Sequence, residues 1–315
     1  MTSSIGGTDR RLGGSVLVVG SVNRDVTVRT SRFPAPGETV TGESVAYGLG
    51  GKGANQAVAA ARAGVSVQLL ATVGDDDPGR ALRAELERLG VGTALVRAST
   101  GRATGSAHIT VDASGQNHIV VVPGANAETG PAQVHDARDA LGRAAVVIVQ
   151  TEIPEPTVTA LVDLAHGTPA RVVLNLAPVI RLPDPVLAGA DVLVVNEHEA
   201  SALLGGPAPV TVAAAGEAAR LLLRRTPAVV VTLGPQGAVW ASRDGAGGHV
   251  EAPGAARVVD TTGAGDALVG VLGAALAAGA SLGGAVRDAV TAATRSVELP
   301  GAGGSYPRFA LAHPG

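Results

Sequence analysis

The stretch SVQLLATVGDDDPGRALRAELERLG, residues 66–90, contains one complete unit of the fold. Residues 66–74 form an apolar run of strand length. Asp77 and Pro78 then supply an N-cap and a first-turn proline for a helix. The helix ends at Gly90, and glycine is the residue type that most often terminates helices. A buried strand followed by a capped helix is typical of a parallel sheet covered by helices.

The same unit recurs along the chain. Apolar runs of four to eight residues, bounded by turn signals, alternate with segments of helical periodicity. We expect central strands at residues 15–20, 66–74, 144–150, 171–176, 191–196 and 228–234. The sequence therefore predicts an α/β fold with a mostly parallel central sheet.

Two segments depart from this alternation. Residues 24–47 and 103–122 alternate polar and apolar positions with a period of two, and the second segment turns at residues 113–116 as a hairpin would. We expect them to form a small β-sheet lid inserted into one continuous domain, residues 15–315. Residues 1–14 are predicted to be a flexible extension.

Composition excludes several classes of protein. The 315 residues are 46% hydrophobic, which is enough for a large core, and the net charge of −3 offers no basic surface for nucleic acid. The absence of cysteine excludes disulfides and favours a reducing compartment, the cytoplasm. Residues 267–286 are uncharged and long enough to span a membrane, but the break at residues 279–281 favours two packed helices instead.

The segment VDTTGAGD, residues 259–266, directly precedes a long Ala/Leu/Val helix. Glycines at a helix N-terminus let backbone N–H groups converge on an anion, which predicts an anion hole there. A carboxylate at position 266 then suits a general base in phosphoryl transfer. The alternative is that Asp266 only complements the helix dipole.

The segment GLGGKGANQ, residues 48–56, matches the pattern G-x-G-x-x-G, and Asp75 follows about 20 residues later, as in a dinucleotide-binding fingerprint. An NAD-dependent dehydrogenase is therefore one alternative. However, residues 43–47 are short and alternating, unlike the buried strand that the fingerprint requires.

A phosphate-binding P-loop is excluded because Gly53 follows Lys52, where Ser or Thr must hold magnesium. Lys52 is the only lysine of the chain. Lys52 and Asn55 are instead suited to binding a polyhydroxy ligand beside a tight backbone approach.

Polar residues also follow predicted strands, where ligands of α/β sheets gather. Asn23 and Asp25 follow the first strand, and Glu152 follows the strand at 144–150. Each could equally belong to an ordinary polar turn.

Asn196 and Glu199 have the spacing of a capping box, and Glu199 could in addition hold a magnesium-bound water. Residues 232–237 form a glycine-bearing turn at the end of the strand predicted at 228–234, which is also consistent with a simple β-turn.

Taken together, eight segments resemble the ribokinase-like family of sugar kinases, often called the PfkB family. The similarity runs from about residue 15 to 306, and the segments occur in the family's order: GSVNRD (20–25), PGETVTG (36–42), GGKGANQAVAA (50–60), TVGDDDPG (72–79), PGAN (123–126), VVNEHEA (194–200), VTLGPQG (231–237) and VVDTTGAGD (258–266).

The resemblance implies a three-layer fold and a role for each matched position. Asp266 would be the base, beside an anion hole of Gly263, Ala264 and Gly265. The ribose-contacting positions would be Asn23, Asp25, Gly51, Lys52, Gly53, Asn55 and Glu152. The nucleotide would contact Asn196, Thr232, Leu233, Gly234, Pro235, Gln236, Gly237 and Gly265. Glu199 would act on Mg²⁺ through water, and a monovalent cation, usually K⁺, would lie near Asp260, Thr262, Ser296, Leu299, Gly301 and Ser305.

The implied function is ATP-dependent phosphorylation of D-ribose at O5, by a homodimer that associates through the lid. Within the same family, the alternatives are kinases of deoxyribose, another pentose or a nucleoside. From other classes, the alternatives are the dehydrogenase and a sugar-sensing module that binds without turnover.

Overall fold

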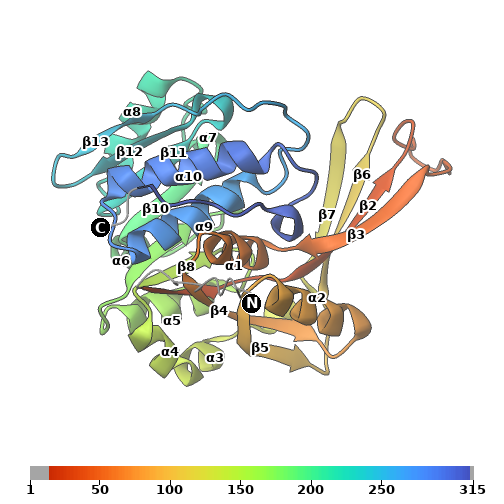
Figure 1. Cartoon of the computed structure of the whole chain (residues 1–315), viewed down its shortest axis with the longest axis horizontal. Coiled ribbons are helices and arrows are strands. Elements are labelled where there is room, and N and C mark those ends of the chain that lie inside the picture. Colours follow the sequence, from red (N-terminus) through yellow and green to blue (C-terminus); the bar gives the residue numbers. More distant parts are fainter. Residues whose placement is uncertain (1–13, 313–315) are drawn as a thin grey trace, which may run out of the picture.

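The computed structural model describes residues 14–312, so most of the predicted N-terminal extension lies outside the described residues. Its centre is a nine-stranded sheet in the order β13-β12-β11-β10-β9-β8-β1-β4-β5 (Figure 1). The strands are β1 (Ser15–Val19), β4 (Ser66–Gly74), β5 (Gly92–Ser99), β8 (Val146–Gln150), β9 (Arg171–Asn175), β10 (Val192–Asn196), β11 (Ala228–Thr232), β12 (Ala238–Ser242) and β13 (Gly247–Val250). All pairs are parallel except β11/β12 and β12/β13. The predicted α/β class and its six central strands are confirmed.

Helices cover both faces of this sheet. One layer contains α1 (Lys52–Arg62), α2 (Asp77–Arg88), α9 (Ala264–Ala277) and α10 (Leu282–Ser296). The other contains α3 (Pro131–Asp136), α4 (Arg138–Arg143), α5 (Glu155–Ala165), α6 (Asp184–Gly189), α7 (Glu197–Leu204) and α8 (Val212–Leu222). Along β1, Val16 and Val18 pack into the first layer, whereas Leu17 and Val19 pack into the second. This alternation produces the expected three layers.

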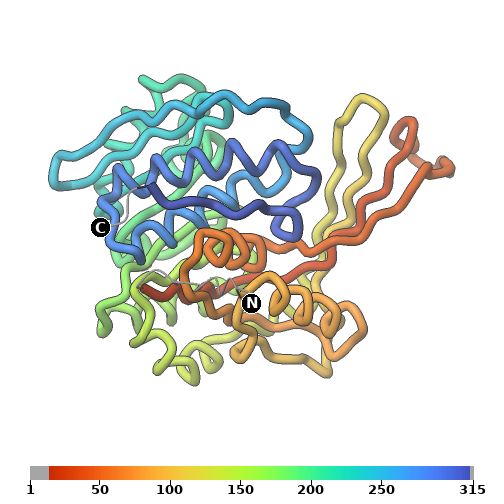
Figure 2. Tube along the Cα trace, in the orientation of Figure 1, coloured from red at the N-terminus to blue at the C-terminus, as the bar shows by residue number. Residues whose placement is uncertain are grey.

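A second, small sheet projects from the main body (Figure 2). It consists of β3 (Ser44–Gly50), β2 (Asn23–Arg29), β6 (Gly105–Val111) and β7 (Asn117–Val122), in that order. β2 pairs antiparallel with β3 and parallel with β6, and β7 pairs antiparallel with β6. The two segments with period-two alternation thus supply all four strands of the small sheet.

The uncharged stretch at residues 267–286 forms two helices, as predicted. α9 ends at Ala277, Gly279 has a φ of 91°, and the Ser281 hydroxyl caps α10 by accepting a hydrogen bond from the Gly284 N–H. Between residues 14 and 312 no helix combines the length and apolar character needed to cross a membrane.

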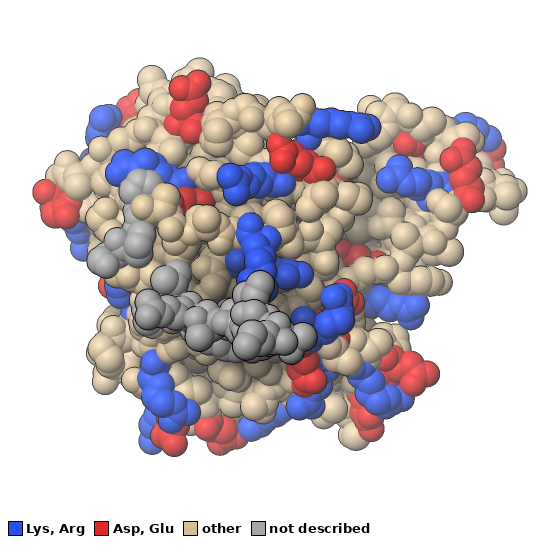
Figure 3. Space-filling model, viewed as in Figure 1, with Lys and Arg blue, Asp and Glu red and all other residues tan. Residues whose placement is uncertain are grey.

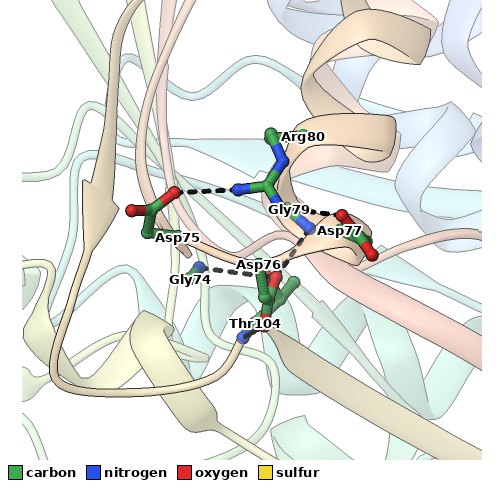
Figure 4. Close-up of polar contacts among 7 residues, drawn as sticks. All are labelled: Gly74, Asp75, Asp76, Asp77, Gly79, Arg80 and Thr104. Carbon is green, nitrogen blue, oxygen red and sulfur yellow. Dashed lines mark hydrogen bonds and ion pairs between the residues drawn. The ribbon is translucent and has the colours of Figure 1, made fainter.

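The N-cap of α2 is Asp76, one residue before the predicted Asp77. The Asp76 carboxylate accepts hydrogen bonds from the backbone N–H groups of Gly79 and Thr104, each at 2.8 Å (Figure 4). Asp77 is the first helical residue and pairs with Arg80 at 2.7 Å. Because Thr104 directly precedes β6, the Asp76 carboxylate also ties α2 to the small sheet.

Gly270 allows α1 and α9 to pack closely. A Cβ atom there would lie 2.4 Å from the Gln56 carbonyl oxygen, so we expect Gly270→Ala to lower the free energy of unfolding. The expected loss is about 1–3 kcal/mol, the usual cost of overpacking. The control is Gly216→Ala in α8, where a Cβ meets no atom within 4 Å. That change should stabilise the protein by about 0.5–1 kcal/mol. Urea unfolding measures both, and equal stabilisation of the two variants would contradict the packing argument.

Candidate active site

The site begins where the N-terminus of α1 meets the end of β1. A Cβ atom at Gly53 would lie 2.5 Å from the Ser21 backbone nitrogen, so only glycine permits this approach. The Ala54 N–H donates to the Ser21 carbonyl oxygen at 2.9 Å. The helix therefore starts in a fixed position, with Lys52 and Asn55 on its first turns.

Asp266 is the third residue of α9 and is only 6% exposed. Asn55 Nδ2 donates to Asp266 Oδ2, and Gln56 Nε2 donates to Asp266 Oδ1, both at 2.9 Å. Two consecutive residues of α1 therefore hold the carboxylate, one at each oxygen. This arrangement fixes a hydrogen-bond acceptor at the N-terminus of a long helix.

Gly263 caps α9 in the left-handed conformation, with φ 76°. Its carbonyl accepts a hydrogen bond from the Tyr306 hydroxyl, and a Cβ atom on Gly263 would meet that hydroxyl at 2.5 Å. By contrast, a Cβ atom on Gly265 would meet no protein atom within 4 Å. Gly265 is exposed, and the first-turn N–H groups of a helix have no carbonyl partner within it, so this helix end borders open space at Gly265, where an anion would be stabilised.

Charged side chains gather around Asp266. Its negative charge, followed by those of Glu152 and Glu199, raises the pKa of Lys52, against the opposing effect of burial. Burial, followed by the charges of Glu152 and Asp266, raises the pKa of Asp25 to about 7. Burial also raises the pKa of Glu199. The structure thus brings together residues predicted from five separate sequence segments.

Glu152 connects three of these segments. Its Oε2 accepts hydrogen bonds from the Ser21 hydroxyl at 2.5 Å and from the Lys52 backbone N–H at 3.0 Å. One carboxylate therefore links the ends of β1 and β8 with the start of α1. Glu152 and Lys52, which the resemblance assigns to the same sugar site, are therefore in direct contact.

Asn126 sets the orientation of the Asn23 amide. Asn126 Oδ1 accepts from the Val22 N–H at 2.8 Å, and Asn126 Nδ2 donates to Asn23 Oδ1 at 2.7 Å. Because a backbone N–H can only donate, the oxygen of Asn126 must face Val22 and its NH₂ group must face Asn23. Asn23 consequently turns its oxygen toward Asn126 and its own NH₂ group away from it.

A cleft of about 660 Å³ separates the small sheet from the segments 258–262 and 300–305. Asp25, one of the predicted sugar-contacting residues, lines this cleft. Asp260 and Thr262 of the predicted cation site line it as well. Lys52, Glu152 and Asp266 are not among its lining residues. The open cleft therefore reaches one edge of the cluster around Asp266.

The ends of β10 and β11 carry the predicted nucleotide residues. Asn196 and Thr232 are neighbours in register, and the turn at Gly234–Gln236 follows directly. The capping box is present: Asn196 accepts from the Glu199 N–H, and Glu199 Oε2 accepts from the Asn196 N–H, each at 2.8 Å. The other carboxylate oxygen of Glu199 is suited to a water on Mg²⁺.

The predicted cation residues fall on two adjacent segments. The Asp260 carboxylate accepts hydrogen bonds from the backbone N–H groups of Thr262 and Gly301, each at 2.9 Å, and the Val259 N–H donates to the Val297 carbonyl. Within residues 14–312, no group of three or more His, Cys, Asp or Glu side chains could hold a metal. The monovalent cation at these positions stays a prediction of the family resemblance, which implies that backbone carbonyls hold it in part. Ser296 is buried and its hydroxyl donates to the Ala293 carbonyl, whereas Leu299 is exposed.

The sequence analysis missed several residues that complete the site. Ser21, Gln56, Asn126 and Tyr306 contact the predicted residues directly, yet it assigned them no role. Only six asparagines occur in the chain, and Asn126 lies in the PGAN segment. That scarcity was the available signal for Asn126.

Known proteins resemble this chain along most of its length. A ribokinase of Bacillus subtilis is 38% identical over 294 residues, which cover 93% of this chain and 96% of that protein. A deoxyribokinase of Salmonella typhi is 34% identical over 295 residues, covering 93% and 95% of the two chains. A solved ribokinase of Arabidopsis thaliana, in complex with ribose and ATP, superposes with a TM-score of 0.88 at 30% identity, covering 94% and 96%.

The family model described as pfkB family carbohydrate kinase matches residues 14–308. This match covers both sheets, the cluster around Asp266 and the predicted nucleotide turn. The chain belongs to the pfkB family of carbohydrate kinases.

Proposed function

We propose that the protein transfers the γ-phosphoryl group of ATP to the O5 hydroxyl of D-ribose. The observation that carries this proposal is the Asp266 carboxylate, fixed in the first turn of α9 beside Gly265, where the helix end borders open space. An acid at an anion-binding helix end is explained when it must take a proton from a group that attacks the anion.

In the proposed reaction, Asp266 accepts the proton of the O5 hydroxyl. The sugar oxygen then forms a bond to the γ-phosphorus while the bond from that phosphorus to the bridging oxygen of ADP breaks. The first-turn amides of α9, among them that of Gly265, stabilise charge on the transferring group. Asn55 and Gln56 keep the base in place throughout.

We propose that the polar cluster beside Asp266 binds the sugar. Lys52 donates to hydroxyl oxygens, whereas Asp25 and Glu152 accept from hydroxyl hydrogens, and Asn23 offers its NH₂ group. A ligand dense in hydroxyls satisfies these partly buried groups, whereas an apolar base would leave them unpaired. This favours a free sugar over a nucleoside.

The nucleotide is proposed to lie over the ends of β10 and β11, against the turn at residues 232–237. Mg²⁺ supplies charge neutralisation for the phosphates, and Glu199 would hold one of its waters. K⁺ would fit between the segments that contain Asp260 and Gly301, which the Asp260 carboxylate joins by accepting hydrogen bonds from the backbone N–H groups of Thr262 and Gly301.

Two further proposals concern the molecule as a whole. The small sheet exposes apolar side chains, including Tyr47 at 61% and Val120 at 64%, which supports a homodimer formed through this sheet. Its closure over the cleft would exclude water. Basic and acidic side chains are interspersed on the face in Figure 3, so this face offers no continuous basic patch for nucleic acid. The absence of cysteine supports the proposed location in the cytoplasm.

The alternatives from other classes have less support. The G-x-G-x-x-G pattern begins within β3 of the small sheet and does not follow a central strand, so it does not form a dinucleotide-binding unit. A module that binds sugar without turnover would need neither a base nor a helix end open to an anion, so the presence of both favours an enzyme.

Replacing the proposed base should remove turnover selectively. Asp266→Asn is expected to lower kcat by about 10²–10⁴, with little change in ribose affinity, because only proton transfer is lost. A coupled ADP-release assay and ribose calorimetry measure the two effects. Asp163→Asn, an exposed carboxylate of α5, is the control and should keep wild-type turnover. Near-wild-type kcat in Asp266→Asn would remove the mechanism.

Asp25 should make stability depend on pH. Because burial and its acidic neighbours raise the pKa of Asp25 from 3.8 to about 7, the folded protein binds a proton that the unfolded chain has lost. Proton binding to Asp25 stabilises the folded state at low pH, and this contribution is lost as the pH rises toward 7. We therefore expect the stability advantage of Asp25→Asn over the wild type to grow from about pH 4 to pH 7 and then level off. Urea unfolding at several pH values tests this, and a constant difference would contradict it.

Substrate choice distinguishes ribose from its relatives. A sugar that lacks one hydroxyl leaves a polar group of the site unpaired, so deoxyribose should lose at least about tenfold in kcat/KM. The ADP-release assay across ribose, deoxyribose, fructose, adenosine and no sugar, with and without K⁺, measures this. If kcat/KM were higher for deoxyribose, deoxyribose would become the proposed substrate in place of ribose.

A further inference from the structure

We propose that Gln56 is a positioning residue for Asp266, locked in one amide orientation by Gln150 and Asn175. This inference rests on the proposed function, since it gives Gln56 a role only if Asp266 is the base. Gln56 itself would act through Asp266 and would not touch the reacting atoms.

The hydrogen bonds of Gln56 leave its amide no unused group. Its Nε2 donates both to Asp266 Oδ1, at 2.9 Å, and to Asn175 Oδ1, at 3.0 Å. Its Oε1 accepts from Gln150 Nε2 at 2.6 Å. An amide nitrogen has two hydrogens, and both are used here, one of them on the carboxylate.

The neighbours of Gln56 make this orientation the only consistent one. Asn175 Nδ2 donates to the Val194 carbonyl oxygen at 3.2 Å, so the oxygen of Asn175 must face Gln56. Asp266, when ionised, can only accept. Rotating the Gln56 amide by 180° would place its oxygen against the oxygens of both Asp266 and Asn175.

Gln150 adds an independent sign that this orientation matters. Gln150 is fully buried at the end of β8, and its Oε1 has no hydrogen-bond partner among the described residues. Buried acceptors without a partner are rare and unfavourable. The unpaired Gln150 oxygen is the cost of pointing the Gln150 NH₂ group at Gln56 Oε1. That contact in turn keeps the Gln56 NH₂ group on Asp266.

The second donor to Asp266 is anchored differently. Asn55 Oδ1 accepts from the Gly303 N–H at 3.1 Å, which turns Asn55 Nδ2 toward Asp266. Asn55 is therefore oriented by the C-terminal segment, whereas Gln56 is oriented by β8 and β9 of the central sheet. Gln56 thus links the central sheet to Asp266 by hydrogen bonds.

The test compares Gln56→Met with a matched control. Methionine keeps the length of the side chain but removes the donor, so kcat should fall by about 10- to 100-fold, as misplacement of a reacting group does. Ribose affinity should not change, and the acid limb of the pH–kcat profile should move to higher pH because the charged carboxylate loses a donor. Gln133→Met is the control, since Gln133 is buried and hydrogen-bonded to Ala71 and Leu95 in β4 and β5. It should lower stability without affecting kcat.

Two more variants separate the possible outcomes. If Gln56 acts through Asp266, Gln56→Met should cause no further loss of kcat in the Asp266→Asn background. Gln150→Met, which does not touch Asp266, should lower kcat less than Gln56→Met does, again at unchanged ribose affinity. Should Gln56→Met fail to fold, the Gln150→Met result decides, and wild-type kcat there would overturn the inference.

The failures of the two proposals can be told apart. Wild-type kcat in Gln56→Met, with a large loss in Asp266→Asn, would overturn the positioning role alone. Additive losses in the double variant would do the same. Wild-type turnover in Asp266→Asn would overturn both proposals.

Discussion

The close approach of α1 to β1 is the constraint on which the rest of the site depends. Gly53 brings the helix backbone against Ser21, and the position of Lys52, Asn55 and Gln56 follows from that contact. A larger residue at position 53 would move all three side chains together. The base is therefore held by a helix whose placement is decided at the end of the first central strand.

Electrostatics make this arrangement costly without a ligand. Asp25, Glu152, Glu199 and Asp266 lie near a single cation, Lys52, and burial raises the pKa of Asp25 to about 7. Carboxylates that share a partly buried region repel one another and lack water. A sugar that donates several hydroxyl hydrogens would relieve this cost, so binding and stability are opposed in these residues.

Features of the fold that depend on local sequence patterns could be predicted from the sequence. Strands buried on both faces and the alternating segments of the small sheet could be predicted, as could the meeting of residues at strand ends. The edge strands β5 and β13 could not, since edge strands have mixed patterns, and β12, the five-residue strand between β13 and β11, was missed as well. Gln56 and Asn126 were missed for another reason: their roles depend on hydrogen-bond partners far away in the sequence. The N-cap of α2 shifted to Asp76 because three consecutive aspartates leave the choice to tertiary contacts.

The lone lysine has a practical consequence for chemistry performed on this protein. Amine-directed acylation, cross-linking, acetylation and ubiquitin attachment all have one side-chain acceptor in the chain, Lys52. Its raised pKa keeps the amine protonated, and only the neutral amine is a nucleophile. Such reagents will therefore react slowly at Lys52, and any labelling of Lys52 reports directly on whether the cluster around it has opened.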